Sequence, residues 1–113
     1  MCSSDLGMFS AKTTPEQREE IRTKMGATPQ HVMASAMEGM LTLEAPKAGE
    51  CSLPVMAIMR AAQAPPEFEA RLRATFPNLR KYEVWEGSGH FLMMESPERF
   101  NRALEEFLAG LVK

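Results

Sequence analysis

The sequence of 113 residues is long enough for one compact domain or for part of one, and its 44% hydrophobic and 25% charged residues are ordinary for a globular protein. Its formal net charge of -2 speaks against nucleic acid or an anionic membrane as a partner, so small-molecule chemistry is the better expectation. No apolar run is long enough to cross a bilayer and no secretion signal opens the chain, which predicts a cytoplasmic protein.

The N-terminal residues do not lead naturally into the rest of the chain. Residues 1–7 show no periodicity and are predicted to be a non-native or disordered appendage. The run CSSDL at residues 2–6 also matches one translated frame of a common sequencing-library adapter. We therefore hypothesise that the chain is a fragment whose true upstream sequence is missing, and codons unlike the adapter would contradict this. Cys2 and Cys51 fit neither a disulfide framework nor a metal-binding pair and are expected to be reduced.

Two helices are predicted in the first half of the chain. The motif TPEQ at residues 14–17 supplies a capping hydroxyl, a proline at the first helical position and a glutamine three residues after the cap. It predicts a helix over residues 15–25 with Gly26 as its stop. Thr28 and Pro29 repeat the start signal for a second helix, whose apolar residues recur at helical spacing: Val32, Met33, Ala36, Met37, Met40 and Leu41.

The second helix carries a broad apolar stripe that is rich in methionine. For Met33, Met37 and Met40, the filling of a core is favoured over the lining of a substrate pocket, because buried apolar stripes are the common case. His31 is interpreted as a surface residue of this helix in preference to one that faces a pocket. The first helix has Ile21 and Met25 as its only strong apolar residues, so most of it is expected to face water, and the pair of helices resembles a cap rather than a core.

Strands are predicted only in the second half, after a linker at residues 44–52 that mixes proline and glycine with charges. The apolar run LPVMAIM at residues 53–59 lacks polar alternation, which favours a strand of a parallel sheet that is covered on both faces. A second strand is predicted at about residues 81–85. The intervening short helix ends before Pro77 and has an apolar edge formed by Phe68, Leu72 and Phe76. This order predicts a parallel pair joined by a right-handed crossover.

The last helix is the most clearly marked element of the sequence. Ser96 and Pro97 start it, and its apolar residues have the spacing of a face packed on a sheet: Phe100, Ala103, Leu104, Phe107, Leu108 and Leu111. The fold class is therefore α/β, with residues 46–113 forming a parallel βαβα unit.

The loop EGSGHF at residues 86–91 lies just past the carboxyl end of the second predicted strand. Ligands of open α/β sheets bind at that end, and a histidine there can move a proton near neutral pH. Gly87 and Gly89 allow the backbone conformations that would present the imidazole of His90 over the sheet edge. On these local features alone, a structural or solvated histidine is the commoner case.

The second half of the chain resembles the α/β-hydrolase family. The resemblance rests on LPVMAI at residues 53–58, YEVWEGSGHF at residues 82–91 and ESPERF at residues 95–100, in this order and spacing. These segments resemble strand seven, strand eight with its histidine loop, and the final helix of that fold. Residues 46–113 would then be the C-terminal part of the hydrolase core, and residues 8–45 the helical cap that members carry between strands six and seven.

The resemblance implies that His90 is the general base of a catalytic triad. It would take a proton from a nucleophile and return it to the leaving group. The nucleophile motif Gly-x-Ser-x-Gly occurs nowhere in the chain, and Gly87-Ser88-Gly89 does not supply it, so Ser88 is interpreted as a turn residue. The oxyanion hole, which uses the backbone of that missing elbow, would be absent as well.

The acid of the triad is also missing from its usual place. The loop after the first predicted strand reads RAAQA at residues 60–64 and contains no carboxylate, and some members place the acid after strand six instead. Glu67 and Glu69 fall on the following helix, where the helix dipole accounts for them, and they receive no catalytic role.

Two classes of function remain open. The leading hypothesis is the C-terminal part of an α/β-hydrolase that acts on a small apolar substrate, with His90 as general base and the chain by itself inactive. It requires the missing N-terminal half, joined to it or encoded separately, to complete the sheet; no cofactor or metal is expected. The alternative is a self-contained, non-catalytic binding module with a βαβα core. Reaction type is open, since fold alone does not choose it.

Overall fold

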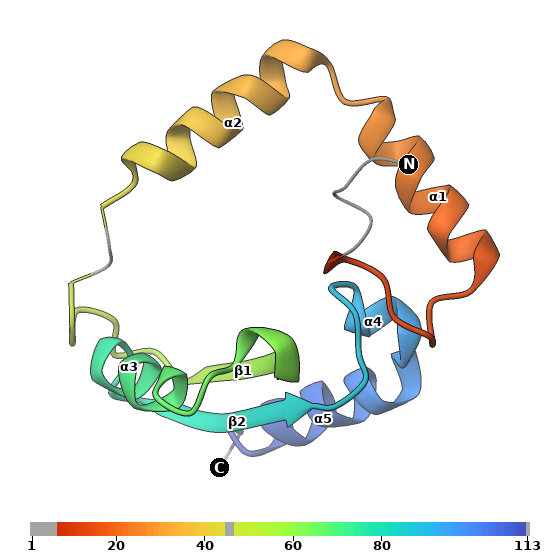
Figure 1. Ribbon diagram of the computed structural model, residues 1–113. Coiled ribbons are helices and arrows are strands. Elements are labelled where there is room, and N and C mark those ends of the chain that lie inside the picture. Colours follow the sequence, from red (N-terminus) through yellow and green to blue (C-terminus); the bar gives the residue numbers. More distant parts are fainter. Residues whose placement is uncertain (1–6, 45–46, 113) are drawn as a thin grey trace.

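The computed structural model describes residues 7–44 and 47–112, a mixed arrangement of helices with one small parallel sheet. Its elements are the helices α1 (Pro15–Gly26) and α2 (Gln30–Thr42), the strand β1 (Val55–Arg60), the 3-10 turn η2 (Ala61–Gln63), the helix α3 (Phe68–Thr75), the strand β2 (Leu79–Trp85), and the helices α4 (Leu92–Glu95) and α5 (Pro97–Ala109). Figure 1 shows α1 and α2 as an arch that joins the other elements at both of its ends.

The sheet consists of β1 and β2, which pair in parallel. The register runs from Met56 opposite Lys81 to Arg60 opposite Trp85, with one irregularity at the start of the strands. The predicted parallel pair is thus confirmed, although both strands are shifted by one or two residues from their predicted bounds. Within the described residues, β1 is paired on one side only, so its other edge carries open backbone hydrogen-bonding groups.

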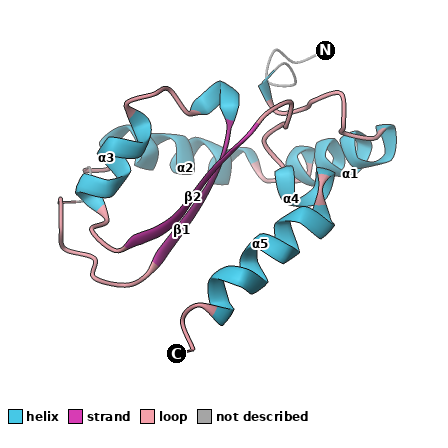
Figure 2. Ribbon diagram, turned by 90° about the horizontal axis from the view of Figure 1, so that it is seen from below, coloured by secondary structure: helices cyan, strands magenta, loops and turns pink. Residues whose placement is uncertain are grey.

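Helices lie on both sides of the strand pair, α3 on one and α5 on the other (Figure 2). On the α5 side, the Lys81 ammonium lies 3.0 Å from the Glu106 carboxylate and 3.2 Å from that of Glu83. Trp85, at the end of β2, is completely buried, and the Arg99 guanidinium of α5 lies 4.0 Å from the centroid of its ring. Few other apolar side chains of the described residues are buried, and these keep a small exposed fraction of 5–7%: Ile21, Leu79, Leu92 and Ala103.

The first helix begins as its sequence predicts. The Thr14 hydroxyl accepts a hydrogen bond from the Gln17 N–H, and the Gln17 side-chain carbonyl accepts one from the Thr14 N–H, which makes a complete capping box. At α2 the repeated signal is not used in the same way, because Pro29 is the N-cap residue and no side chain caps the helix. The Thr28 hydroxyl instead lies 3.5 Å from the carbonyl oxygen of Lys24.

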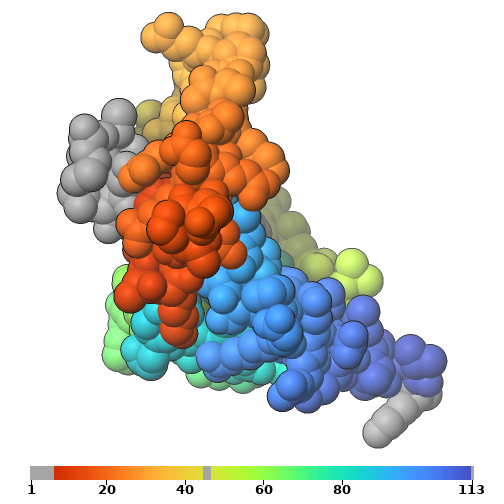
Figure 3. All heavy atoms as spheres, turned by 90° about the vertical axis from the view of Figure 1, so that its right-hand side faces the viewer, coloured from red at the N-terminus to blue at the C-terminus, as the bar shows by residue number. Residues whose placement is uncertain are grey.

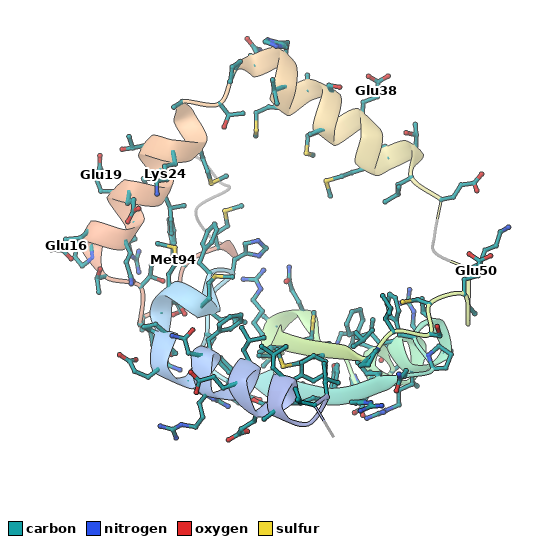
Figure 4. All side chains as sticks on the ribbon, turned by 180° about the vertical axis from the view of Figure 1, so that it is seen from behind. Glu16, Glu19, Lys24, Glu38, Glu50 and Met94 are labelled. Carbon is teal, nitrogen blue, oxygen red and sulfur yellow. The ribbon has the colours of Figure 1, made fainter. Side chains whose placement is uncertain are left out.

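The apolar stripe of α2 is not buried. Met33, Met37 and Met40 have exposed fractions of 42%, 56% and 72%, and no residue of α2 is buried. The interpretation of these methionines as core filling is therefore wrong for this chain. In Figure 4 the sulfur atoms of α2 lie on the side of the helix that faces the sheet, and Glu38 points to the outer side.

The chain is less compact, and exposes more surface, than a globular domain of its length. Its Cα radius of gyration is 16.4 Å, whereas a compact domain of this length has about 13 Å. Its accessible surface is 8325 Å², about 2,000 Å² more than is typical of a monomer of this mass. No helix of the described residues is both long enough and apolar enough to cross a membrane. Residues 1–6 and the predicted boundary at residues 45–46 lie outside the described residues.

Candidate functional site

The histidine loop, residues 86–91, leaves the carboxyl end of β2 and returns the chain to α4. Gly87 has a φ of 62°, in the left-handed region that glycine tolerates without steric cost, so it makes the turn directly after the strand. Gly89 has no such backbone conformation but is buried. The loop thus bends at Gly87 and is packed at Gly89.

His90 is exposed, whereas the backbone that carries it is fixed. Its N–H donates a hydrogen bond of 2.7 Å to the carbonyl oxygen of Met8. Its ring meets the ring of Phe91 edge-on, with centroids 5.1 Å apart and planes at 88°. No side chain among residues 7–44 and 47–112 forms a hydrogen bond with the imidazole, which is therefore open to a group that the described chain does not supply.

The N-terminal segment, residues 7–13, lies against this loop and holds a defined conformation. The Ser10 N–H donates to the Thr13 hydroxyl oxygen at 2.9 Å, and the Thr13 N–H donates to the Ser10 carbonyl at 3.2 Å. The Arg18 guanidinium of α1 binds the carbonyl oxygens of both residues, at 2.8 and 3.2 Å. Figure 3 shows this segment in red, packed against the cyan and blue residues that come after β2.

Further contacts connect the same segment and α1 to the end of the sheet. The Arg60 guanidinium at the end of β1 donates to the carbonyl oxygen of Gly7, and the Lys12 ammonium lies 3.3 Å from that of Glu86. The Gln17 side-chain amide donates to the Met94 carbonyl at 2.7 Å. The described part of the N-terminus is therefore tied to both strand ends and to α4.

The carboxylate of Glu95, at the end of α4, joins the histidine loop to the N-terminal segment. Its Oε2 accepts the Gly89 N–H at 2.8 Å, and its Oε1 accepts the hydroxyl of Thr13, a side chain only 5% exposed. Burial alone would raise the pKa of Glu95, but the hydrogen bonds from Thr13, Gly89 and Ser10 outweigh it and leave the pKa below its ordinary value of 4.5. The ionised carboxylate is thus the form that this site holds.

Gly89 lies in the middle of these contacts. A Cβ atom added there would lie 2.5 Å from Oε1 of Glu95, 2.6 Å from the Met8 carbonyl oxygen and 3.0 Å from the Ser10 nitrogen. Two of these neighbours are backbone atoms, so they cannot move aside without displacing the N-terminal segment. Glycine at this position is required by space and not by backbone conformation.

Replacing Gly89 with alanine is expected to destabilise the fold by about 1–3 kcal/mol, because the added methyl overpacks the contact with Met8 and Glu95. Urea denaturation in dilute solution, followed by far-UV circular dichroism, measures the change. Gly39→Ala is the matched control: it lies within α2 with open space around it and is expected to stabilise by about 0.5–1 kcal/mol. A Gly89→Ala variant as stable as the parent would contradict this packing.

Of the other residues considered from the sequence, His31 and Glu69 lie apart from this arrangement, whereas Ser88 belongs to the loop itself. His31 is exposed on α2, as interpreted. The Glu69 carboxylate forms an ion pair with the Arg73 guanidinium of the same helix, with the two groups 2.7 Å apart. The Ser88 hydroxyl is buried without a hydrogen-bond partner among the described residues, so it forms no hydrogen bond with the His90 imidazole. No cluster of three or more metal-ligating side chains occurs in the described ranges.

Comparison with protein-family models, with curated proteins and with solved structures finds no match to this chain. The assignment of a function therefore depends on the residues themselves and on their arrangement.

Proposed function

We propose that this chain is the C-terminal part of an α/β-hydrolase that acts on a small apolar substrate, with His90 as its general base. The observation that carries the proposal is an exposed histidine, held by its backbone at the carboxyl end of a parallel strand pair. Reacting groups of open α/β sheets are placed at this end, because the loops there can vary without disturbing the packed layers. A fixed backbone, and an imidazole that no described side chain binds, suit a general base whose nucleophile would come from outside the described residues.

In this proposal His90 takes a proton from the nucleophile as it attacks the substrate and returns that proton to the leaving group. The nucleophile and the acid would come from residues that precede this sequence, since Gly-x-Ser-x-Gly is absent and residues 60–64 contain no carboxylate. The 113-residue chain by itself is then inactive.

The exposed surface of the chain favours the hydrolase fragment over a self-contained binding module. No described residue pairs with the free edge of β1 or buries the methionine-rich face of α2, and both are features that proteins normally cover. The excess accessible surface of about 2,000 Å² on this chain alone is larger than the about 800 Å² that each partner buries in a standard interface. A further sheet strand beside β1 and a core beneath α2 would remove it.

Activity of the completed enzyme is the test. The coding sequence upstream of Gly7 is joined in frame, and the product is assayed against small apolar esters, amides and haloalkanes. The proposal expects a nucleophile elbow in the upstream sequence and turnover of one of these classes. An upstream sequence that continues for a domain's length without such an elbow would contradict it.

The competing function is a self-contained binding module, and solution behaviour separates the two. Because of its exposed apolar surface, the isolated chain is expected to self-associate in sedimentation velocity. The double substitution Met37→Gln and Met40→Gln should shift the distribution toward monomer, whereas Glu38→Gln, on the outer side of the same helix, should not. A monomer that melts cooperatively would favour the binding module.

A further inference from the structure

We propose that Glu95 is a positioning residue for His90: its carboxylate ties the histidine loop to the N-terminal segment and fixes the backbone from which the imidazole projects. The inference rests on the function proposed above and adds a residue to its machinery. Glu95 has no place in the chemistry itself, because it acts through the backbone of Gly89 and through Thr13.

The Glu95 carboxylate is hydrogen-bonded directly to the histidine loop. The Gly89 N–H donates to Oε2 at 2.8 Å, and the next N–H along the chain, that of His90, donates to Met8 at 2.7 Å. Two consecutive amides are therefore each bound by an acceptor outside the loop. Since both flank the Cα of Gly89 and lead into that of His90, they restrict the torsions that aim the imidazole.

The two acceptors that bind the loop, the Glu95 carboxylate and the Met8 carbonyl, are connected through the N-terminal segment. Oε1 of Glu95 accepts the Thr13 hydroxyl, whose oxygen in turn accepts the Ser10 N–H at 2.9 Å. Met8, which holds His90, lies in the same segment as Ser10 and Thr13. Loss of the carboxylate would thus release Gly89 directly and would loosen the support of the Met8 carbonyl as well.

A carboxylate suits the position of Glu95 better than any neutral side chain does. An ionised carboxylate only accepts hydrogen bonds, and the groups that approach it from Gly89, Thr13 and Ser10 are donors. Bonds to an ionised acceptor are about twice as strong as neutral ones. An amide side chain would present a donor to one of these donors.

The surroundings contain other charges that a pH experiment must consider. From α1, Arg18 binds the carbonyls of Ser10 and Thr13; from the N-terminal segment, Lys12 approaches the Glu86 carbonyl; and His90 and Glu86 belong to the loop. Glu95 has a lowered pKa, so its contribution is complete above the ordinary glutamate value and is lost as pH falls through the folded-state value below 4.5.

Hydrogen exchange of the intact chain tests the proposal. In mass spectrometry of peptides that cover residues 86–91, Glu95→Gln is expected to exchange at least tenfold faster than the parent at neutral pH, in line with the loss of a bond to a charged acceptor. As pH falls below 4.5, the parent should approach the variant, whose own profile, corrected for intrinsic exchange, stays flat. Glu106→Gln, which removes a carboxylate paired with Lys81 on α5, should leave these peptides unchanged.

Equal exchange in the parent and in Glu95→Gln would overturn the proposal. If Glu95→Gln does not fold, as judged by peptides from β2, Thr13→Val is the second variant: it removes the hydroxyl that donates to the carboxylate and accepts the Ser10 N–H, and it makes the same prediction with a smaller increase. In the completed enzyme, Glu95→Gln should lower kcat more than it raises KM, and Glu95→Asp should restore part of it. Unchanged kcat in Glu95→Gln, while His90→Ala is inactive, overturns the role of Glu95 alone. If the loop exchanges faster in Glu95→Gln but His90→Ala keeps full activity, the proposed function is overturned instead.

Discussion

Replacing His90 with alanine in the completed enzyme is expected to lower kcat/KM by about 10²–10⁴-fold, the range that a positioned general acid and base contributes. The substitution should cost little stability, because the imidazole is exposed and no described side chain forms a hydrogen bond with it. The loop backbone is held by Met8 and Glu95 through N–H groups that the variant retains. Loss of rate without loss of fold is therefore the expected pattern.

His31→Ala is the control for this experiment, since it removes the only other histidine of the sequence from an exposed position on α2. It should leave kcat/KM within about twofold of the parent, in keeping with the small effects of surface substitutions. A decrease of less than about tenfold in His90→Ala, measured with the best substrate of the panel, would count against the role of His90 as general base.

Most elements of the fold can be predicted because their signals are local. The capping box at Thr14 and the proline starts of α1 and α5 act within one helical turn, so the sequence contains the whole interaction. The first strand is predicted from an apolar run and the second from its place after the short helix. The predicted bounds differ by a residue or two, except at the end of β2, because pairing, and not composition, decides where a strand begins and ends. The turns η2 and α4 are too short to show periodicity, and neither is predicted.

The methionine stripe of α2 shows the limit of periodicity as evidence. A stripe predicts that one face is covered, but it does not say whether the covering group belongs to the same chain. Met40, at 72% exposure, has the pattern of a core residue without the core. The same pattern agrees with the proposed fragment, in which the covering part precedes this sequence.

The candidate site is only partly visible in the sequence. The position of His90 after β2 comes from the order of the elements, and the turn at Gly87 from its residue type. The roles of Glu95, Thr13 and Met8 could not be predicted, because they depend on contacts between residues about 80 positions apart in the sequence. A usable signal is present in Gly89: a second glycine without a turn to explain it indicates a close approach of other backbone.

Trp85 is the residue on which the stability of the described fold depends most. It is completely buried at the end of β2, and its indole N–H donates to the Glu83 carboxylate at 2.7 Å. That hydrogen bond is the main reason why the pKa of Glu83 lies below its ordinary value, with Lys81 contributing. The guanidinium of Arg99 covers the ring at 4.0 Å, so the indole connects β2 to α5 by packing, hydrogen bonding and a cation–π contact.

Trp85→Ala is expected to lose about 3–5 kcal/mol, the cost of removing a buried tryptophan and leaving a cavity. A small domain has about 5–15 kcal/mol in total, and this one buries few other apolar side chains, so the variant should be largely unfolded in mild urea. Trp85→Phe retains an aromatic ring but loses the N–H donor and part of the buried ring volume, so its stability should lie between those of the parent and of Trp85→Ala. Far-UV circular dichroism is the measurement, because the substitution removes the single tryptophan and with it the fluorescence signal.

Val84→Ala, on the same strand but 39% exposed, is the control with a small expected loss of stability. If Trp85→Ala were no less stable than Val84→Ala, the packing of α5 on β2 would not be the source of this fold's stability.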